Sequence, residues 1–154
     1  MTTEAEQRQA VVAAVRKWVL TPYHFEADIL GAGVDCGMLL VRVFVDLGLV
    51  PPFDPRPYPP DWMLHRDEER YLGWVYKACG PVEKPQPGDI ALFRFGRCYS
   101  HGGVVTQADP VAIVHAFRDV GMVVEERIAQ NPVLTMPVHK LAYFSYWAPN
   151  KGAA

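Results

Sequence analysis

The chain is 154 residues long and 50% hydrophobic, which is the size and composition of one ordinary globular domain with a buried core. We therefore expect a single domain over residues 1–154. The formal net charge is -2 and no block of like charges is present, so neither a nucleic-acid partner nor an anionic membrane surface is expected.

The N-terminal residues (MTTEAEQRQ) are polar and acidic, and the sequence holds no run of about 18 apolar residues. These features predict synthesis in the cytoplasm without a signal peptide, and no insertion into a membrane. The three cysteines, Cys36, Cys79 and Cys98, show no CxxC spacing and are too few for a disulfide scaffold. They therefore indicate neither a zinc site nor a disulfide framework.

Two helices are predicted in the first third of the chain. Thr3 and Glu6 fit a capping box, and apolar residues recur at helical spacing after them, so residues 4–19 are expected to form an amphipathic helix. The next apolar run (CGMLLVRVFVDLGLV) ends at Gly48. Its valines and phenylalanine also suit a strand, but its length and its boundaries favour a buried helix over about residues 36–47.

The central part of the chain is rich in proline, and the last part has the pattern of strands. Residues 50–64 are too rich in proline for regular structure and predict a surface loop, followed by a helix over about residues 66–79. Short β-branched or aromatic runs then alternate with turn residues. The predicted strands are residues 90–95, 103–106, 112–117, 122–126 and 141–147. This order predicts an α+β fold, in which the early helices pack on a curved antiparallel sheet of about five strands.

Cys36 lies where a glycine-containing loop (GAGVD) meets the second predicted helix. At a helix N-terminus the positive end of the macrodipole and the unpaired backbone N–H groups stabilise a thiolate, which lowers the thiol pKa. The same N–H groups are suited to hold a developing oxyanion. On position alone, a buried and inert cysteine is an equally good interpretation.

A cysteine nucleophile needs a base, and histidine is the usual one. Three of the five histidines are interpreted as exposed: His24, His65 and His139. His101 opens a predicted strand beside Gly102 and Gly103, which remove side-chain bulk next to its ring, and His115 lies in the following strand. In a hairpin turning at residues 107–110, both imidazoles fall on one face, and His115 orients His101 through its second nitrogen. A lone strand histidine would be a core residue, but the combination favours a Cys-His-His relay.

Three blocks carry a more specific signal through their order and spacing. They are residues 21–23 (TPY) with 31–36 (GAGVDC), residues 87–93 (PGDIALF) continuing to 100–105 (SHGGVV), and residues 114–116 (VHA). In these blocks the sequence resembles the NlpC/P60 cysteine peptidases over about residues 5–147. The resemblance implies a papain-like α+β core and cleavage of amide bonds in bacterial peptidoglycan stem peptides, typically between D-glutamate and diaminopimelate. It implies no metal ion and no organic cofactor.

The resemblance also implies roles for individual residues. Cys36 corresponds to the nucleophile, His101 to the general base and then acid, and His115 to the polar residue that orients it. Tyr23 would line the site near the oxyanion. Asp89 is interpreted as a turn former outside the site.

Further positions are expected to contact substrate. Gly37, Ser100 and Gly102 flank the catalytic residues, and Asp35 is either a substrate contact or the N-cap of the helix. The usual Asp-Cys-Ser-Gly of the family is here Asp-Cys-Gly-Met, so the serine hydroxyl is replaced by Gly37 and the glycine by Met38. In relatives that recognise a free N-terminal L-alanine this serine belongs to the recognition subsite, so the departure bears on substrate choice.

Residues 58–62 (YPPDW) and 65–72 (HRDEERYL) resemble the phage and prophage branch of the family, the tail-associated cell-wall peptidases. This branch implies phage tail proteins as partners, and a virion- or tail-associated location from which the enzyme acts in the periplasm or cell wall. The alternatives are an inactive tail-hub or plug module, an N-acetylmuramoyl-L-alanine amidase, and a secreted toxin with the same fold.

Overall fold

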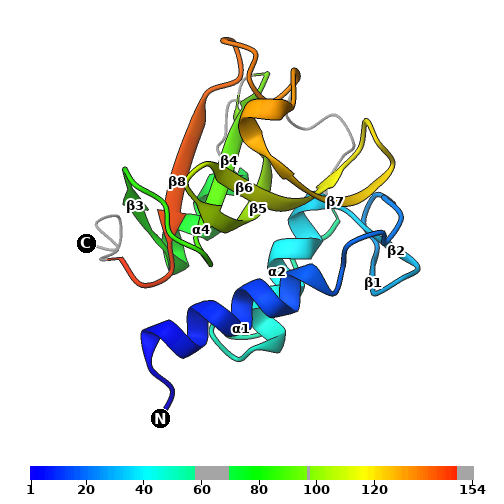
Figure 1. The fold of residues 1–154 in the computed structure, drawn as a ribbon. Helices are drawn as coiled ribbons and strands as arrows, with labels where there is room; N and C mark the ends of the chain where they lie inside the picture. Colours follow the sequence, from blue (N-terminus) through cyan, green and yellow to red (C-terminus); the bar gives the residue numbers. More distant parts are fainter. Residues whose placement is uncertain (58–69, 97, 149–154) are drawn as a thin grey trace.

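The computed structural model describes residues 1–57, 70–96 and 98–148, and the ribbon is drawn in Figure 1. In these residues, six strands form an antiparallel sheet of order β3-β8-β4-β5-β6-β7, and two short strands form a separate hairpin. The helices are α1 (Glu4–Arg16), α2 (Cys36–Asp46), α4 (Arg70–Ala78) and the single turn η1 (Ile128–Gln130). The strands are β1 (Asp28–Ile29), β2 (Gly33–Val34), β3 (Gly80–Val82), β4 (Ile90–Phe95), β5 (Cys98–Ala108), β6 (Val111–Phe117), β7 (Met122–Arg127) and β8 (Leu141–Ser145).

The helix α1 begins as predicted but ends earlier. The capping box of Thr3 and Glu6 is present in both directions. The helix ends at Arg16 instead of residue 19, because Leu20 adopts a left-handed backbone (φ 74°) and its N–H donates to the carbonyl of Val123 (2.9 Å). The chain thus leaves the helix to run along the edge of β7.

The helix α2 confirms the choice of helix over strand for the second apolar run. It begins at Cys36 with Asp35 as its N-cap, and most of its residues are buried. The helix α4, from Arg70 to Ala78, lies within the predicted range of about residues 66–79. Residues 51–57 of the proline-rich segment are irregular, as expected, whereas the tail-peptidase block at 58–69 lies outside the described residues. No described helix is long and apolar enough to cross a membrane.

The five predicted strands are present as β4 to β8, although β8 ends at Ser145 and not at residue 147. β5 begins at Cys98, where it pairs with Phe95, so His101 lies inside the strand and does not open it. β3 was not predicted, because a three-residue Gly-Pro-Val segment gives almost no periodic signal and its proline is tolerated only at a sheet edge. It pairs with β8 and forms that edge.

The two faces of the sheet carry different apolar clusters. The helices α1, α2 and α4 cover one face, where Val15, Leu39 and Val75 pack against strand residues such as Val104. Figure 1 shows α1 and α2 side by side beneath the sheet. The other face carries a second cluster, whose members include Phe93, Ile113, Phe117, Ile128 and Leu134.

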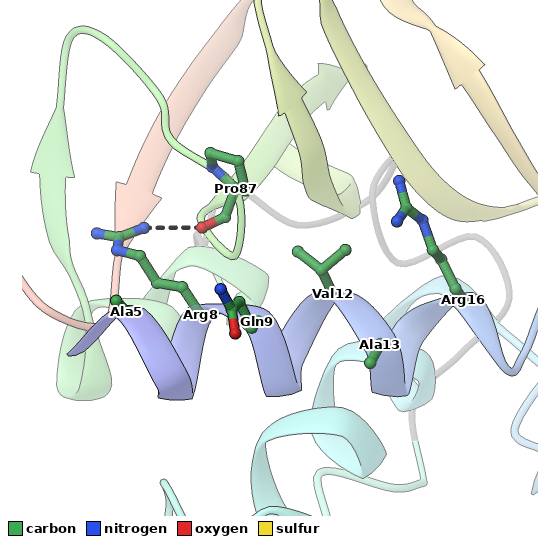
Figure 2. A pocket seen from close by; sticks show the side chains of 7 residues that line it. All are labelled: Ala5, Arg8, Gln9, Val12, Ala13, Arg16 and Pro87. Carbon is green, nitrogen blue, oxygen red and sulfur yellow. Dashed lines mark hydrogen bonds between the residues drawn. The ribbon is translucent and has the colours of Figure 1, made fainter. Parts of the chain in front are cut away.

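Arg8 of α1 ties this helix to the loop before β4. Its guanidinium donates to the carbonyl of Pro87 (3.0 Å) and to the carboxylate of Asp89 (2.8 Å). Asp89 also accepts from the backbone N–H of Gln86 (2.8 Å), which confirms its interpretation as a turn former. A shallow groove of about 430 Å³ runs along α1 beside this contact, between Arg8 and Arg16 (Figure 2). None of the predicted site residues lines this groove.

Candidate active site

Cys36 is half-buried at the first position of α2. Its thiol donates a hydrogen bond to the backbone carbonyl of Ser100 in β5 (3.7 Å). The pairing of β5 with β4 continues to Cys98, whereas its pairing with β6 extends only from Val104 to Ala108. The N-terminus of α2 therefore approaches β5 beyond the end of its pairing with β6, beside the residue that precedes His101.

His101 and His115 project from the same face of the sheet, as the hairpin argument predicted. Nε2 of His101 lies 2.8 Å from Nδ1 of His115, so one of these nitrogens donates a hydrogen bond to the other. Gly103 permits this approach, because a Cβ there would lie 2.9 Å from the Cβ of His115 and 2.8 Å from the carbonyl oxygen of Val114. The glycine thus makes room for the second histidine.

The chain of contacts continues to residues that the sequence analysis did not identify. Nε2 of His115 lies 2.7 Å from a carboxylate oxygen of Glu126 in β7, and the other oxygen accepts from the side-chain amide of Asn131 (3.1 Å). β6 pairs with β7 so that Val124 lies opposite His115, which places Glu126 diagonally across on the same face. Glu126 could have been found from the sequence by pairing β6 with β7 across a turn at Gly121 and selecting the β7 residues on the same face as His115.

Aromatic side chains enclose the histidine pair. Phe95 stacks on His101 with ring centroids 5.3 Å apart, and Phe117 stacks on His115 at 4.9 Å. The two imidazoles are 5% and 0% exposed, respectively. This burial, together with the neighbouring His115, lowers the pKa of His101 well below its usual range, so its imidazole is a neutral hydrogen-bond acceptor and potential base at neutral pH.

Solved structures share this arrangement of helices and sheet. NlpC1 from Trichomonas vaginalis superposes with a TM-score of 0.67 and 15% identity, over 97% of this chain and 47% of that one. The NlpC/P60 domain of the peptidoglycan hydrolase SagA superposes with a TM-score of 0.58 and 16% identity, over 88% of this chain and 96% of that domain. The chain has the NlpC/P60 fold. It spans about half the length of NlpC1.

A third structure with the same fold is an N-acetylmuramoyl-L-alanine amidase from Bacteroides uniformis, with a TM-score of 0.56, 13% identity, and coverage of 90% of this chain and 98% of that one. In sequence, no family model and no curated protein matches the chain. The correspondence is therefore one of backbone arrangement, and it supports the predicted α+β fold with helices on a curved antiparallel sheet.

In this NlpC/P60 fold, Tyr23 lies close to Cys36. Its backbone N–H donates to the carbonyl of Gly121 (2.8 Å), and Tyr23 also bridges to Val34, so the segment is held between β7 and β2. Burial raises the pKa of the Tyr23 phenol above its usual range, and the nearby Cys36 and Asp35 raise it further. The hydroxyl therefore stays protonated at neutral pH and can donate a hydrogen bond.

Asp35 is the N-cap of α2, which confirms one of its two interpretations. One carboxylate oxygen accepts from the backbone N–H of Met38 (2.8 Å) and the other from that of Glu26 (2.7 Å). The side chain is 2% exposed and thereby fixes the orientation of the helix start that carries Cys36. A contact between Asp35 and substrate stays a prediction.

The remaining predicted substrate contacts are buried. Ser100 is 7% exposed and its hydroxyl donates to the carbonyl of Phe95 (3.2 Å), so the described contacts of this side chain are structural. Gly102 is buried in β5 opposite Leu92, and Gly37 is buried in the first turn of α2. Contacts of these three residues with a substrate stay predictions.

The other cysteines and histidines contribute differently. Cys79 is buried in the core beneath α4, and burial raises its thiol pKa to about 12. His24 is exposed, as predicted. The same prediction for His139 is wrong: its ring packs on Phe95 (centroids 4.4 Å apart) and Nδ1 lies 2.7 Å from the carbonyl oxygen of Val133. His65 lies outside the described residues, among which no cluster of histidine, cysteine and acidic side chains fits a metal ion.

Proposed function

We propose that this protein is a cysteine peptidase of the NlpC/P60 family that hydrolyses amide bonds in the stem peptides of bacterial peptidoglycan. The observation that carries the proposal is the hydrogen bond from the Cys36 thiol, at the start of α2, to the carbonyl of Ser100, the residue that precedes His101 in its hydrogen-bonded pair with His115. The NlpC/P60 domain of SagA, which has the same fold, belongs to a peptidoglycan hydrolase.

The first chemical step is acylation of Cys36. Transfer of its proton to His101 leaves a thiolate, and this thiolate attacks the carbonyl carbon of the scissile amide. The oxyanion that forms accepts hydrogen bonds from backbone N–H groups at the N-terminus of α2 and from the protonated hydroxyl of Tyr23. His101 then gives the proton to the leaving amine, and an acyl-thioester remains on Cys36.

Water completes the cycle. His101, now neutral again, takes a proton from a water molecule that attacks the thioester, and then returns this proton to the departing sulfur. His115 holds the imidazole of His101 in one orientation through both steps, since it engages the Nε2 atom only. The ring nitrogen that exchanges protons with Cys36 and substrate is therefore Nδ1.

The preferred bond is the one between D-glutamate and diaminopimelate, which is the typical target of the family that the sequence resembles. A second candidate is the bond between N-acetylmuramic acid and L-alanine, because the protein of the same fold from Bacteroides uniformis is an amidase of this kind. Gly37 in place of the usual serine affects the recognition of a free N-terminal L-alanine, so intact stem peptides are the better substrates to test.

Digestion of purified sacculi, followed by mass spectrometry of the released fragments, tests the proposal. We expect fragments with a new N-terminus on diaminopimelate in digests with the wild type and none with Cys36→Ala. Release of whole stem peptides from muramic acid would support the amidase. Identical digests with wild type and Cys36→Ala on every sacculus would contradict the proposal and favour an inactive structural module.

We further propose that the protein acts in the periplasm or cell wall as a component of a phage or prophage tail. The support is the sequence block at residues 58–72, which resembles tail-associated peptidases. Local opening of the wall during genome injection needs few turnovers. We expect mass spectrometry to detect the protein in purified tail particles. Its consistent absence there, with capture of a small inhibitory partner from the producing cell, would contradict the tail role and indicate a toxin.

A further inference from the structure

We propose that Glu126 is a positioning residue that fixes the two histidines in one proton arrangement, in which Nδ1 of His101 keeps its lone pair for the Cys36 proton. The inference rests on the proposed function, because it assigns His101 as the base. It goes beyond that function by extending the relay to a fourth side chain in β7 and by assigning the tautomer of each ring.

The geometry determines the direction of every hydrogen bond in the chain of contacts. An ionised carboxylate can only accept, so the Nε2 atom of His115, 2.7 Å from Glu126, must carry the hydrogen. In a neutral ring Nδ1 of His115 is then an acceptor, and the Nε2 of His101, 2.8 Å away, must donate to it. His101 thereby carries its hydrogen on Nε2, and its Nδ1 atom is the basic nitrogen.

Two features keep Glu126 in the state that this arrangement needs. The hydrogen bond with His115, despite some opposing burial, lowers the pKa of Glu126 below its usual range, so the carboxylate is ionised at neutral pH. Its second oxygen accepts from Asn131, and Asn131 cannot turn its amide around, because its own oxygen accepts from the backbone N–H groups of Val133 (2.9 Å) and Leu134 (3.1 Å).

The proton transfer balances along this chain. The S–H bond of Cys36 breaks and an Nδ1–H bond forms on His101, which gives a thiolate and an imidazolium. The imidazolium keeps its Nε2–H bond to His115, and the carboxylate of Glu126 offsets the new positive charge across the shared pair. Without Glu126, this charge would form without an offsetting carboxylate in a nearly closed aromatic site, where burial and the neighbouring His115 lower the pKa of His101.

Because the amide of Asn131 is fixed, Glu126→Gln tests the proposal more specifically than Glu126→Ala. A glutamine oxygen would face the Asn131 amide, so its NH₂ group would face Nε2 of His115 and donate to it. His115 would then carry its hydrogen on Nδ1 and donate to His101, whose own hydrogen would move to Nδ1. The nitrogen needed for the Cys36 proton would thus be occupied. Glu126→Ala, in contrast, only removes the preference for the Nε2–H tautomer.

The first measurement is NMR of nitrogen-labelled histidine side chains in the wild-type protein at neutral pH. We expect both His101 and His115 as the Nε2–H tautomer, and in Glu126→Gln we expect both as Nδ1–H. A wild-type protein in which either ring carries its hydrogen on Nδ1 would overturn the proposal, and this result needs no variant to fold.

The second measurement is the alkylation rate of Cys36 by iodoacetamide at neutral pH, followed on the Cys36 peptide by mass spectrometry. We expect a loss of at least about tenfold in Glu126→Gln and a smaller loss in Glu126→Ala. Glu125→Gln is the matched control, because the adjacent carboxylate binds Arg16 of α1 (3.0 Å), and it should alkylate like the wild type. An unchanged rate in Glu126→Gln, or equal losses in both Glu126 variants with wild-type tautomers, would overturn the proposal.

Neither measurement uses peptidoglycan. The expected tautomers and alkylation rates in a protein that releases no product from sacculi would contradict the proposed function alone. Conversely, hydrolysis of sacculi by Glu126→Gln at the wild-type rate would support the proposed peptidase function and overturn the role of Glu126.

Discussion

His115 is completely buried, and both of its ring nitrogens are nevertheless hydrogen-bonded, one to His101 and the other to Glu126. A buried imidazole nitrogen without a hydrogen-bond partner would reduce the free energy of unfolding by about 1–3 kcal/mol. Because both nitrogens of His115 have partners, the ring can lie within the apolar cluster without this cost. At the scale of single residues, the site is therefore a row of hydrogen-bonded side chains, His101, His115 and Glu126, surrounded by aromatic rings. Each hydrogen bond fixes the orientation of the next side chain.

Substitution of the proposed nucleophile or base should remove almost all turnover without unfolding the protein. We expect no measurable hydrolysis of sacculi by Cys36→Ala and a loss of roughly 10²- to 10⁴-fold in His101→Ala, because the thiol then lacks its base. His115→Ala should lose less and retain measurable activity, because it only orients His101.

Cys79→Ala is the matched control for these variants. Its thiol is in the core, with a pKa raised to about 12, and takes no part in the chemistry, so kcat should be retained at temperatures where the variant is folded. Loss of kcat in Cys79→Ala, with Cys36→Ala still active, would reverse the assignment of the nucleophile.

The buried histidine predicts a pH dependence of stability. The pKa of His101 in the folded protein lies below its ordinary value of 6.5, so well above pH 6.5 neither state binds the proton and this residue costs no stability. As the pH falls below this value, His101 binds a proton in the unfolded chain but not in the folded protein, so the free energy of unfolding decreases. Each unit of difference between the two pKa values contributes about 1.4 kcal/mol.

Urea unfolding between about pH 7.5 and pH 5 measures this effect. His101→Phe should fit among the surrounding aromatic rings and show a smaller decrease in the free energy of unfolding over this range. This pH range stays above 4.5, the ordinary pKa of Glu126. Because the pKa of Glu126 is lowered in the folded protein, its protonation reduces stability only at pH values below this range. Parallel slopes in wild type and His101→Phe would argue against a depressed pKa at this position.

At the scale of elements, β5 carries the site. It pairs with β4 from Cys98 to Val104 and with β6 from Val104 to Ala108. The start of α2 contacts it at Ser100, beyond the pairing with β6, and His101 meets His115 on the face that carries the second apolar cluster. The close packing at Gly103 decides how near β6 can come, because any side chain there meets the Val114 carbonyl.

Gly103→Ala should therefore damage stability and catalysis together. The added methyl group lies under 3 Å from His115 and from the backbone of β6, so we expect a loss of about 1–3 kcal/mol in unfolding free energy and a fall in kcat as the histidines separate. In Gly73→Ala, within α4, the methyl group meets nothing within 4 Å and should stabilise by up to about 1 kcal/mol. A Gly103→Ala protein with wild-type stability and kcat would contradict the close approach.

At the scale of the whole molecule, α1 joins the first residues of the chain to its last strand. Arg8 bonds Pro87 and Asp89, donates to the hydroxyl of Ser145 (3.2 Å), and lies over the ring of Trp147 (4.2 Å to its centroid). Figure 2 shows Arg8 reaching toward Pro87 from the helix. These contacts hold the helical layer against the sheet at the end away from β7.

Arg8→Ala should be far more destabilising than Arg16→Ala, although both arginines line the same groove of α1. Asp89 is 2% exposed and would lose its charged partner, for which we expect about 3 kcal/mol. The Arg16–Glu125 pair is 51% and 34% exposed, and its loss should cost less than about 1 kcal/mol. Urea unfolding compares the two, and equal losses would contradict a structural role of the buried pair.

The sequence alone determined the features that depend on local signals. The capping box at Thr3, the start of α2 at Cys36 and the period-two strands depend on residues within a few positions of one another, so the helical and sheet regions were predictable. The facing pair of histidines followed from two adjacent strands and a short turn. Local rules failed at Leu20 and β3, because hydrogen bonds to distant strands set the end of α1 and the existence of β3.

Only the tertiary structure decided which carboxylate joins the site. Glu125 and Glu126 are neighbours in a strand and indistinguishable by composition, yet one binds Arg16 of α1 and the other His115. The strand alternation sends them to opposite faces, and the register between β6 and β7 determines which face meets the histidines. Likewise, the capping contact of Asp35 with Met38 is local, but its second oxygen accepts from Glu26 only because the chain folds back there through the β1–β2 hairpin. Such assignments need the positions of several elements at once, which no short stretch of sequence contains.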